Sequence, residues 1–291
     1  MRQNNSSQIK SGAIISYAGI IISTVASLLY TPWMKDQIGD ANYGLYTLVG
    51  SLVAIFMMDF GLATSVTRFI SKYRAENNEI QINNVMGYVF KLYIAIDVII
   101  SIVLFIVYFL IDDIYIGLSI SERDTLKKIF LIFATYSVLA FPFTPLSGVL
   151  NAYEKFVWLK FCELFQKLFA IFLTVLALLT NHGVVALVLM TAVSGIATIA
   201  IKLWIIGAGK MIRPNFRVHD KVLLHELFGF SIWVTVLALA QRLIFNIAPS
   251  ILGITSTSIE IARFAPASQL EGYFFTFAYA INGLFMPMVA R

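Results

Sequence analysis

The sequence predicts an all-α polytopic membrane protein with about eight transmembrane helices. Hydrophobic residues make up 59% of the 291 residues and charged residues only 13%, whereas a soluble domain has about 25% charged residues. The apolar residues also form runs of about twenty, the length at which a helix crosses a bilayer, and only short polar breaks separate them. These two properties exclude a soluble globular domain, because lipid must take the place of a water-facing surface.

The expected spans, in chain order, are residues 12–31, 43–69, 86–111, 127–150, 157–180, 183–207, 227–252 and 260–288. The first apolar run is longer than the hydrophobic part of a signal peptide and lacks a small-residue cleavage site, so we expect it to remain as the first span. Turn-forming residues occupy the breaks between spans. Prolines interrupt the fourth span and lie within or beside the last two: Pro142, Pro145, Pro249, Pro266 and Pro287.

The distribution of Lys and Arg predicts the orientation. One set of alternating segments holds twelve of these residues: Arg2, Lys10, Arg68, Lys72, Arg74, Lys155, Lys160, Lys202, Lys210, Arg213, Arg217 and Lys221. The opposite set holds at most five: Lys35, Arg123, Lys127, Lys128 and Arg263. Because short cytoplasmic loops carry the positive excess, the amino terminus is predicted to be cytoplasmic. The net charge of +5 then reflects topology, and no nucleic-acid partner is expected.

Charges inside the apolar spans are the candidate functional residues, because an unpaired charge in the bilayer is costly. In the fifth span, Lys160, Glu163 and Lys167 fall at i, i+3 and i+7 and so line one stripe of a helix. The stripe faces either the interior of the bundle or a water-filled cavity. In the seventh span, Arg242 and Asn246 share a face at i, i+4, too deep for the arginine to reach the headgroups easily.

The stretch MDFGLATSVTRF places Asp59 in the cytoplasmic half of the second span and Arg68 near its end. The Asp59 carboxylate is too short to reach the headgroups, so it serves either as a structural group or in a cavity. Arg68 is interpreted as an anchor at the headgroups. Cys162 is the single cysteine, and the three histidines are scattered, so no metal site or cofactor is predicted.

Three stretches resemble a known family: IGDANYGLY at 38–46, DFGL through TRF at 59–69, and GVLNAYEKF at 148–156. In this order and spacing they are similar to the polysaccharide-biosynthesis or O-antigen-type flippases of the multidrug/oligosaccharidyl-lipid/polysaccharide exporter superfamily. The resemblance implies two six-helix bundles that face each other across a cavity. It divides this chain into a first bundle at 1–207, a basic cytoplasmic loop at 208–226, and the first two helices of a second bundle at 227–291. On that comparison the chain is expected to be truncated at Arg291.

The resemblance also implies a function, which is the flipping of undecaprenyl-diphosphate-linked oligosaccharide across the bacterial inner membrane by alternating access, for surface polysaccharide or O-antigen synthesis. Expected partners are the lipid-linked oligosaccharide, membrane lipids and the polysaccharide polymerase machinery. Lys160, Lys167 and Arg242 would provide a cationic route for the pyrophosphate, and Asp59 and Glu163 would position those cations or respond to protonation.

Three alternatives stay open. A cation-coupled multidrug antiporter of the same superfamily would need acidic residues in the cavity of its first bundle, commonly on the first helix, and residues 12–30 carry no charge. A membrane glycosyltransferase or polymerase would need a sizeable aqueous loop with a carboxylate cluster, and only Asp112 and Asp113 come near. A structural scaffold would not need deep charges. The sequence therefore predicts a transporter and not an enzyme.

Overall fold

The computed structural model describes residues 2–57, 62–180, 182–217 and 221–289, and the side chains of 17–57, 63–180, 182–217 and 235–278. Helices and short turns account for these ranges, with no strand among them. The elements are α1 (Arg2–Ile38), α2 (Asp40–Phe56), α3 (Leu62–Ala75), α4 (Glu79–Ile114), α5 (Ile120–Ala140), the 3₁₀ turn η1 (Phe141–Phe143), α6 (Pro145–Ala152), α7 (Phe156–Leu179), α8 (Gly183–Ala208), α9 (Lys221–Thr255) and α10 (Ser258–Val289). The predicted all-α class is confirmed.

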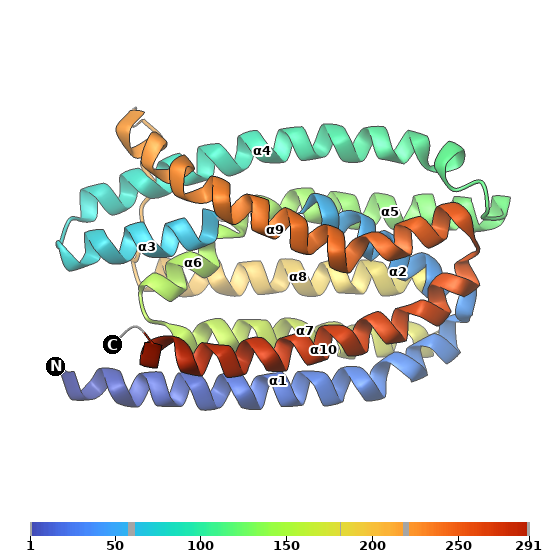
Figure 1. The fold of residues 1–291 in the computed structure, drawn as a ribbon, viewed down its shortest axis with the longest axis horizontal. Helices are drawn as coiled ribbons and strands as arrows, with labels where there is room; N and C mark the ends of the chain where they lie inside the picture. The colour runs from blue at the N-terminus through green and yellow to red at the C-terminus, as the bar shows by residue number, and fades with distance from the viewer. Residues whose placement is uncertain (1, 58–61, 181, 218–220, 290–291) are drawn as a thin grey trace.

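Most of the helices run back and forth along one long axis (Figure 1). The end where α1 begins, here called the amino end, also carries the α3–α4, α6–α7 and α8–α9 connections and the end of α10. The opposite end, here called the turn end, carries the α1–α2, α4–α5, α7–α8 and α9–α10 connections. The two sets of Lys and Arg residues distinguished in the sequence therefore lie toward opposite ends of the molecule.

Six helical segments of the described chain are long and apolar enough to cross a membrane: Tyr17–Ile38, Glu79–Ile114, Ile120–Ala152, Phe156–Leu179, Gly183–Ala208 and Thr235–Thr255. The outer faces of these helices expose large apolar side chains, as on α4, where Ile94, Val98, Ile102, Phe105 and Phe109 are exposed. Their spacing of three or four residues makes one continuous apolar stripe along the helix. Such a stripe is solvated by lipid and not by water, so the protein is a multi-pass membrane protein.

The second predicted span, 43–69, is wrong as a single helix. The α2 helix ends at Phe56, followed by Met57 at ψ 47°, and α3 begins at Leu62. A backbone at this ψ has left the helical region, which ends α2 within an apolar run that contains no proline. With 17 residues, α2 is shorter than the other spans and is not among the six membrane-crossing segments. The α10 helix, whose side chains are described to residue 278, is not among them either. Asp59 and Gly61 fall outside the described residues.

The predicted interruption of the fourth span is confirmed. The α5 helix ends at Ala140, η1 contains Pro142, and α6 starts at Pro145. Proline lacks the N–H that a helix interior requires and its ring crowds the preceding turn, so two prolines three residues apart break the span. Pro249, in contrast, lies inside α9, which continues through it.

Two of the motif stretches meet where α3 packs on α6. Thr67 donates a hydrogen bond to the Gly148 carbonyl at 3.2 Å, and Arg74 donates to the Ala152 carbonyl. A Cβ on Gly148 would lie 2.6 Å from the Ala63 carbonyl oxygen, so this close approach requires glycine. These motif residues therefore fix the packing of two short helices at the amino end.

The α2 helix lies at the centre of the molecule. It packs against α5 of the first bundle and against both α9 and α10. Its buried residues include Leu45, Leu48 and Val49, which are almost fully excluded from the surface. The first bundle therefore presents α2 to the two helices that follow it in the chain, and the space beside α2 becomes the site described next.

Candidate functional site

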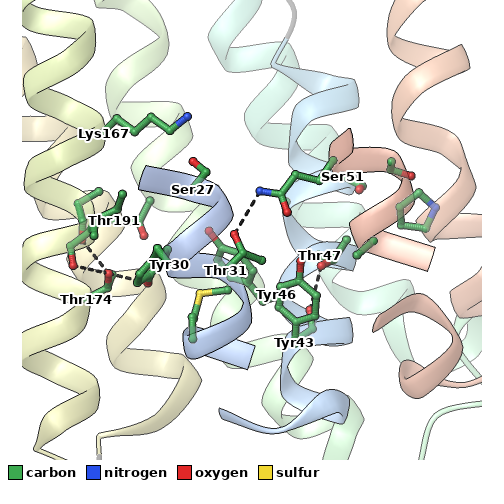
Figure 2. Close-up of a pocket in the computed structure, with 18 of the residues that line it drawn as sticks. Ser27, Tyr30, Thr31, Tyr43, Tyr46, Thr47, Ser51, Lys167, Thr174 and Thr191 are labelled. Carbon is green, nitrogen blue, oxygen red and sulfur yellow. Dashed lines mark hydrogen bonds between the residues drawn. The ribbon is translucent and has the colours of Figure 1, made fainter. Parts of the chain in front are cut away.

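A cavity of about 540 Å³ lies between four helices of the first bundle and the pair α9 and α10 (Figure 2). Its volume falls within the range of about 300–1,000 Å³ that is usual for ligand pockets. The lining residues come from α1, α2, α7, α8, α9 and α10. Hydroxyl side chains dominate the polar part of the lining: Ser27, Tyr30, Thr31, Tyr43, Tyr46, Thr47, Ser51, Thr174, Thr191 and Ser268.

The α2 helix supplies a continuous polar stripe to this cavity. Tyr43, Tyr46, Thr47, Gly50 and Ser51 follow one another at i, i+3, i+4, i+7 and i+8, so they share one face of the helix. The opposite face carries the buried leucines and valines that hold α2 in the core. One helix therefore combines a packing face with a cavity face.

Hydrogen bonds tie the other walls together. Tyr30 of α1 donates to the Thr174 hydroxyl of α7 at 2.6 Å (Figure 2). Gln269 of α10 donates to the Thr31 hydroxyl at 3.1 Å, which joins the second bundle to α1 directly across the cavity. The Thr174 hydroxyl in turn donates to the backbone of its own helix. Thr47 and Thr191 likewise donate to carbonyls of their own helices, so many of the lining hydroxyls are already oriented.

Lys167 is the one cation among the residues found to line the cavity, and no carboxylate is found among them. Its side chain is half-buried and extends into the cavity above Ser27 (Figure 2). Within the described part of the chain, Lys167 forms no salt bridge. The cavity therefore carries an uncompensated positive charge in otherwise neutral, hydroxyl-rich surroundings.

The other residues proposed from the sequence take several positions. Asn246 lines the cavity, and its amide donates to the Arg242 carbonyl at 3.2 Å. Arg242 is half-buried one turn away and is not among the lining residues, so the structure does not bring its guanidinium to the cavity wall. Lys160 and Glu163 form a salt bridge of 2.8 Å beside a second, smaller cavity. Asp59 lies outside the described residues.

The hydroxyl lining was missed by reasoning from the sequence, which weighed charges alone. Serine, threonine and tyrosine are common in apolar helices and cost far less to bury than a charge, so none stands out singly. The signal that was available is the spacing of Tyr43, Tyr46, Thr47 and Ser51 on one face of an otherwise apolar span. Over the described residues, no group of acidic, histidine or cysteine side chains is placed to hold a metal ion.

The contact between the two bundles is tightest at the turn end. Ser258, at the start of α10, donates to Glu122, which also accepts from the Ser119 N–H at 2.8 Å and caps α5. A Cβ on Gly44 would lie 1.9 Å from the Ser258 carbonyl oxygen, and a Cβ on Gly117 would lie 2.5 Å from that of Ser256. This contact, here called the latch, brings α2 and α5 directly against the turn between α9 and α10. It holds α2 and α5 close to α9 and α10 at this end, beside a further cavity of about 400 Å³ that α1, α2 and α10 line.

A family model described as "Polysaccharide biosynthesis protein" matches residues 9–290, nearly the whole chain. The chain belongs to this family. No match was found among the curated proteins compared with this chain.

Solved transporter structures share the fold of this family member. A MATE protein in complex with MaL6 superposes with a TM-score of 0.65 at 14% identity, over 97% of this chain and 70% of that chain. The complex with MaD5 gives 0.63 at 14% identity, over 96% and 70%. A MOP superfamily transporter from Pyrococcus furiosus, described by "reverse polarity of binding pocket suggests different function", gives 0.64 at 15% identity, over 97% and 70%. The chain therefore combines membership of a polysaccharide-biosynthesis family with the fold of these solved structures.

Proposed function

We propose that this protein moves a lipid-linked oligosaccharide, carried on undecaprenyl diphosphate, across the bacterial inner membrane by alternating access. The observation that supports the proposal best is the composition of the cavity, which combines many hydroxyls, two amides and one unpaired lysine. A glycan presents hydroxyl donors and acceptors that match such a lining. The pyrophosphate that joins glycan to lipid is anionic and needs a cation in the membrane interior.

Lys167 would serve this anion as a mobile point charge. A lysine already paired with a carboxylate would offer little net attraction, whereas Lys167 has no such partner within the described chain. Tyr43, Tyr46 and Thr47 would meet the sugar units on the opposite wall, supported by the rigid α2 helix. Binding at this site would therefore recognise the junction between phosphate and glycan.

A cation-coupled multidrug antiporter is the competing function. The similarity to the MATE structures favours it, but at 14% identity that similarity concerns the fold and not the function. A cation site requires acidic side chains, and none is found among the residues lining this cavity. The positive charge of Lys167 in the cavity favours an anionic cargo over a cationic one.

The latch suggests which way the transporter faces. With the amino end assigned to the cytoplasm by its excess of Lys and Arg, the latch would hold the helices together on the periplasmic side. The α9 and α10 helices converge at that end and diverge toward the amino end (Figure 1). The structure would then correspond to a state that receives cargo from the cytoplasm. Release would require the latch to part as one bundle rocks against the other.

The test is translocation in liposomes that contain the full chain and a fluorescent undecaprenyl-diphosphate oligosaccharide. Appearance of the glycan on the far leaflet is followed with a membrane-impermeant glycosidase. Lys167→Gln should slow translocation by about tenfold or more, because a charged hydrogen bond contributes about 1.5–3 kcal/mol, and Lys167→Arg should retain most of the rate. Gradient-driven efflux of a cationic dye without oligosaccharide movement would contradict the proposal and favour the antiporter.

A further inference from the structure

A groove on the side of the first bundle is separate from the latch and the loops. It is a cavity of about 330 Å³ between α1 and α7. The α1 wall consists of Gly19, Ile20 and Ser23. The α7 wall consists of Val157, Lys160, Phe161, Glu163, Leu164 and Lys167. Phe161 and Val157 are 48% and 45% exposed, so the groove opens on the outer surface where lipid would surround the protein.

Lys167 belongs to both cavities, because it lines the central cavity and also the groove. The two spaces therefore meet at its side chain. Seven residues further along α7, Thr174 accepts the hydrogen bond from Tyr30 and closes the seam between α1 and α7. The groove therefore adjoins the hydroxyl-lined cavity at Lys167, and the Tyr30–Thr174 hydrogen bond joins α1 to α7 further along the two helices.

The lining of the groove suits an amphiphilic anion as its ligand. Ile20, Val157, Phe161 and Leu164 provide apolar walls. Lys160 and Lys167 lie seven residues apart on one face of α7, so their Cα atoms are about 10 Å apart along the helix axis and two ammonium groups line the groove in sequence. Lys160 is paired with Glu163 at 2.8 Å, while Lys167 has no salt bridge within the described chain, so the net charge of the groove is positive and rises toward the cavity.

We infer that this groove binds the phosphate and the adjoining hydrocarbon of a polyprenyl-phosphate lipid, and is the lateral path by which the headgroup of the cargo reaches the cavity. The hydrocarbon would lie on the apolar walls, open to the bilayer, while the phosphate moves from Lys160 to Lys167. The glycan would then enter the hydroxyl-lined space. The inference rests on the proposed function for the identity of the cargo, but its main test measures lipid binding, which does not depend on transport.

Gly19 offers a direct way to close the groove. A Cβ at this position meets nothing within 4 Å, so a larger side chain would project into the open groove without disturbing its neighbours. Leucine is also a far better helix former than glycine, so Gly19→Leu should fold. Gly207 on α8 is the matched control, since it is exposed and a Cβ there also meets nothing within 4 Å, but it borders neither cavity.

The experiment measures binding of undecaprenyl phosphate to the purified full chain in detergent micelles by native mass spectrometry. Phosphatidylglycerol and inorganic pyrophosphate are titrated in separate arms. Undecaprenyl phosphate should bind the wild-type chain more tightly than either. Gly19→Leu and Lys160→Gln with Lys167→Gln should each weaken it at least tenfold, and Gly207→Leu should stay within twofold of the wild type.

Unchanged binding of undecaprenyl phosphate in Gly19→Leu would overturn the inference. Phosphatidylglycerol that binds as tightly as undecaprenyl phosphate would also overturn it, because the groove would then be a general lipid site. Inorganic pyrophosphate that binds as tightly would do the same, because the hydrocarbon would then contribute nothing. Oligosaccharide translocation that persists at the wild-type rate in Gly19→Leu would also overturn the groove while leaving the proposed function intact. If the wild-type chain moves no oligosaccharide but Gly19→Leu still loses undecaprenyl phosphate binding, the groove would be supported as a lipid-binding site. Only the proposed function would then be refuted.

Discussion

Gly44 lies where a side chain has no room. Its Cβ position is 1.9 Å from the backbone carbonyl of Ser258, and a backbone atom cannot move aside as a flexible side chain can. Gly44→Ala should therefore lower the free energy of unfolding by about 1–3 kcal/mol, the usual cost of overpacking. Thermal unfolding of the purified protein, followed by intrinsic fluorescence, measures this change.

Gly50 provides the control on the same helix. It lines the cavity, and a Cβ there meets nothing within 4 Å. Gly50→Ala should leave the melting temperature unchanged or raise it slightly, because alanine favours the helix by about 1 kcal/mol. Equal melting temperatures for the two variants would show that the close contact between α2 and α10 does not exist in the folded protein.

The positions of single residues could be predicted from the sequence only in part. The spacing of Lys160, Glu163 and Lys167 correctly placed them on one face of α7, and the structure brings all three to one groove. The same reasoning failed to separate Lys167, which reaches the central cavity, from Arg242, which does not. Depth along a helix follows from counting residues, whereas the direction that a helix face takes depends on its neighbours.

The loop between α8 and α9 is attached to α4 by hydrogen bonds. The Asn83 side chain of α4 accepts from the Arg213 N–H at 2.6 Å, and the Asn83 carbonyl accepts from the Asn215 N–H at 3.0 Å. A Cβ on Gly87 would lie 1.9 Å from the Asn215 carbonyl oxygen. This loop leads from α8 to α9, so its attachment to α4 helps to fix where α9 begins relative to the preceding helices.

Asn83→Ala should release this loop. Because the bond is exposed and water can replace the lost acceptor, the loss costs about 0.5–1.5 kcal/mol, which corresponds to cleavage of the opened loop about two- to tenfold faster. Trypsin digestion of the purified protein, followed by cleavage after Lys210, Arg213 and Arg217, measures the rate. Asn84→Ala, which removes only a side-chain contact with Asn215 at 3.0 Å, should have a smaller effect. A wild-type cleavage rate in Asn83→Ala would show that the loop is held by other contacts.

The elements themselves were predicted unevenly. Hydropathy located the long spans, because about twenty apolar residues admit few other structures in lipid. The break between α2 and α3 was not predicted. Asp59 and Gly61, which both disfavour a helix interior, occur there in the sequence, but the residues on either side are apolar and no proline marks the position. The break between α5 and α6 was predicted, because two prolines supply a local physical cause.

The latch acts at the scale of the whole molecule, because it joins the first bundle to α9 and α10. Ser258→Ala and Glu122→Gln should each destabilise the protein by about 1 kcal/mol, and their coupling in a double-mutant cycle should be about 0.5–1 kcal/mol. Chemical unfolding in detergent gives these values. Thr255→Ala is the control, because that hydroxyl bonds only within α9, to Ile251 at 2.9 Å. Additive effects of the two latch substitutions would show that Glu122 and Ser258 do not interact.

The orientation of the molecule is open to a direct test, and the background from native cysteine is low because Cys162 is fully buried. Arg217 and Asp113 are exposed near opposite ends. In intact cells, Asp113→Cys should react with a membrane-impermeant maleimide, and Arg217→Cys should react only after the membrane is opened. The reverse labelling pattern would place the amino terminus outside the cytoplasm.

The arrangement of two bundles around a cavity was implied by the resemblance and not by the pattern of residues. Local spacing predicts which residues share a helix face, but it does not say which faces meet across the molecule. The pairing of Gln269 with Thr31, 238 positions apart in the chain, illustrates the difference. Contacts at this range depend on how all the helices pack together.

The central claim is that the space between the bundles contains water and is positively biased by Lys167. The most direct measurement is the reaction of Ser51→Cys, on the α2 wall of the cavity, with an anionic and a cationic methanethiosulfonate reagent, each rate normalised to that of a free thiol in solution. The normalised anionic rate should exceed the cationic rate several-fold, and Lys167→Gln should abolish the difference. A cysteine that neither reagent reaches, or one that favours the cationic reagent while Lys167 is present, would contradict the account.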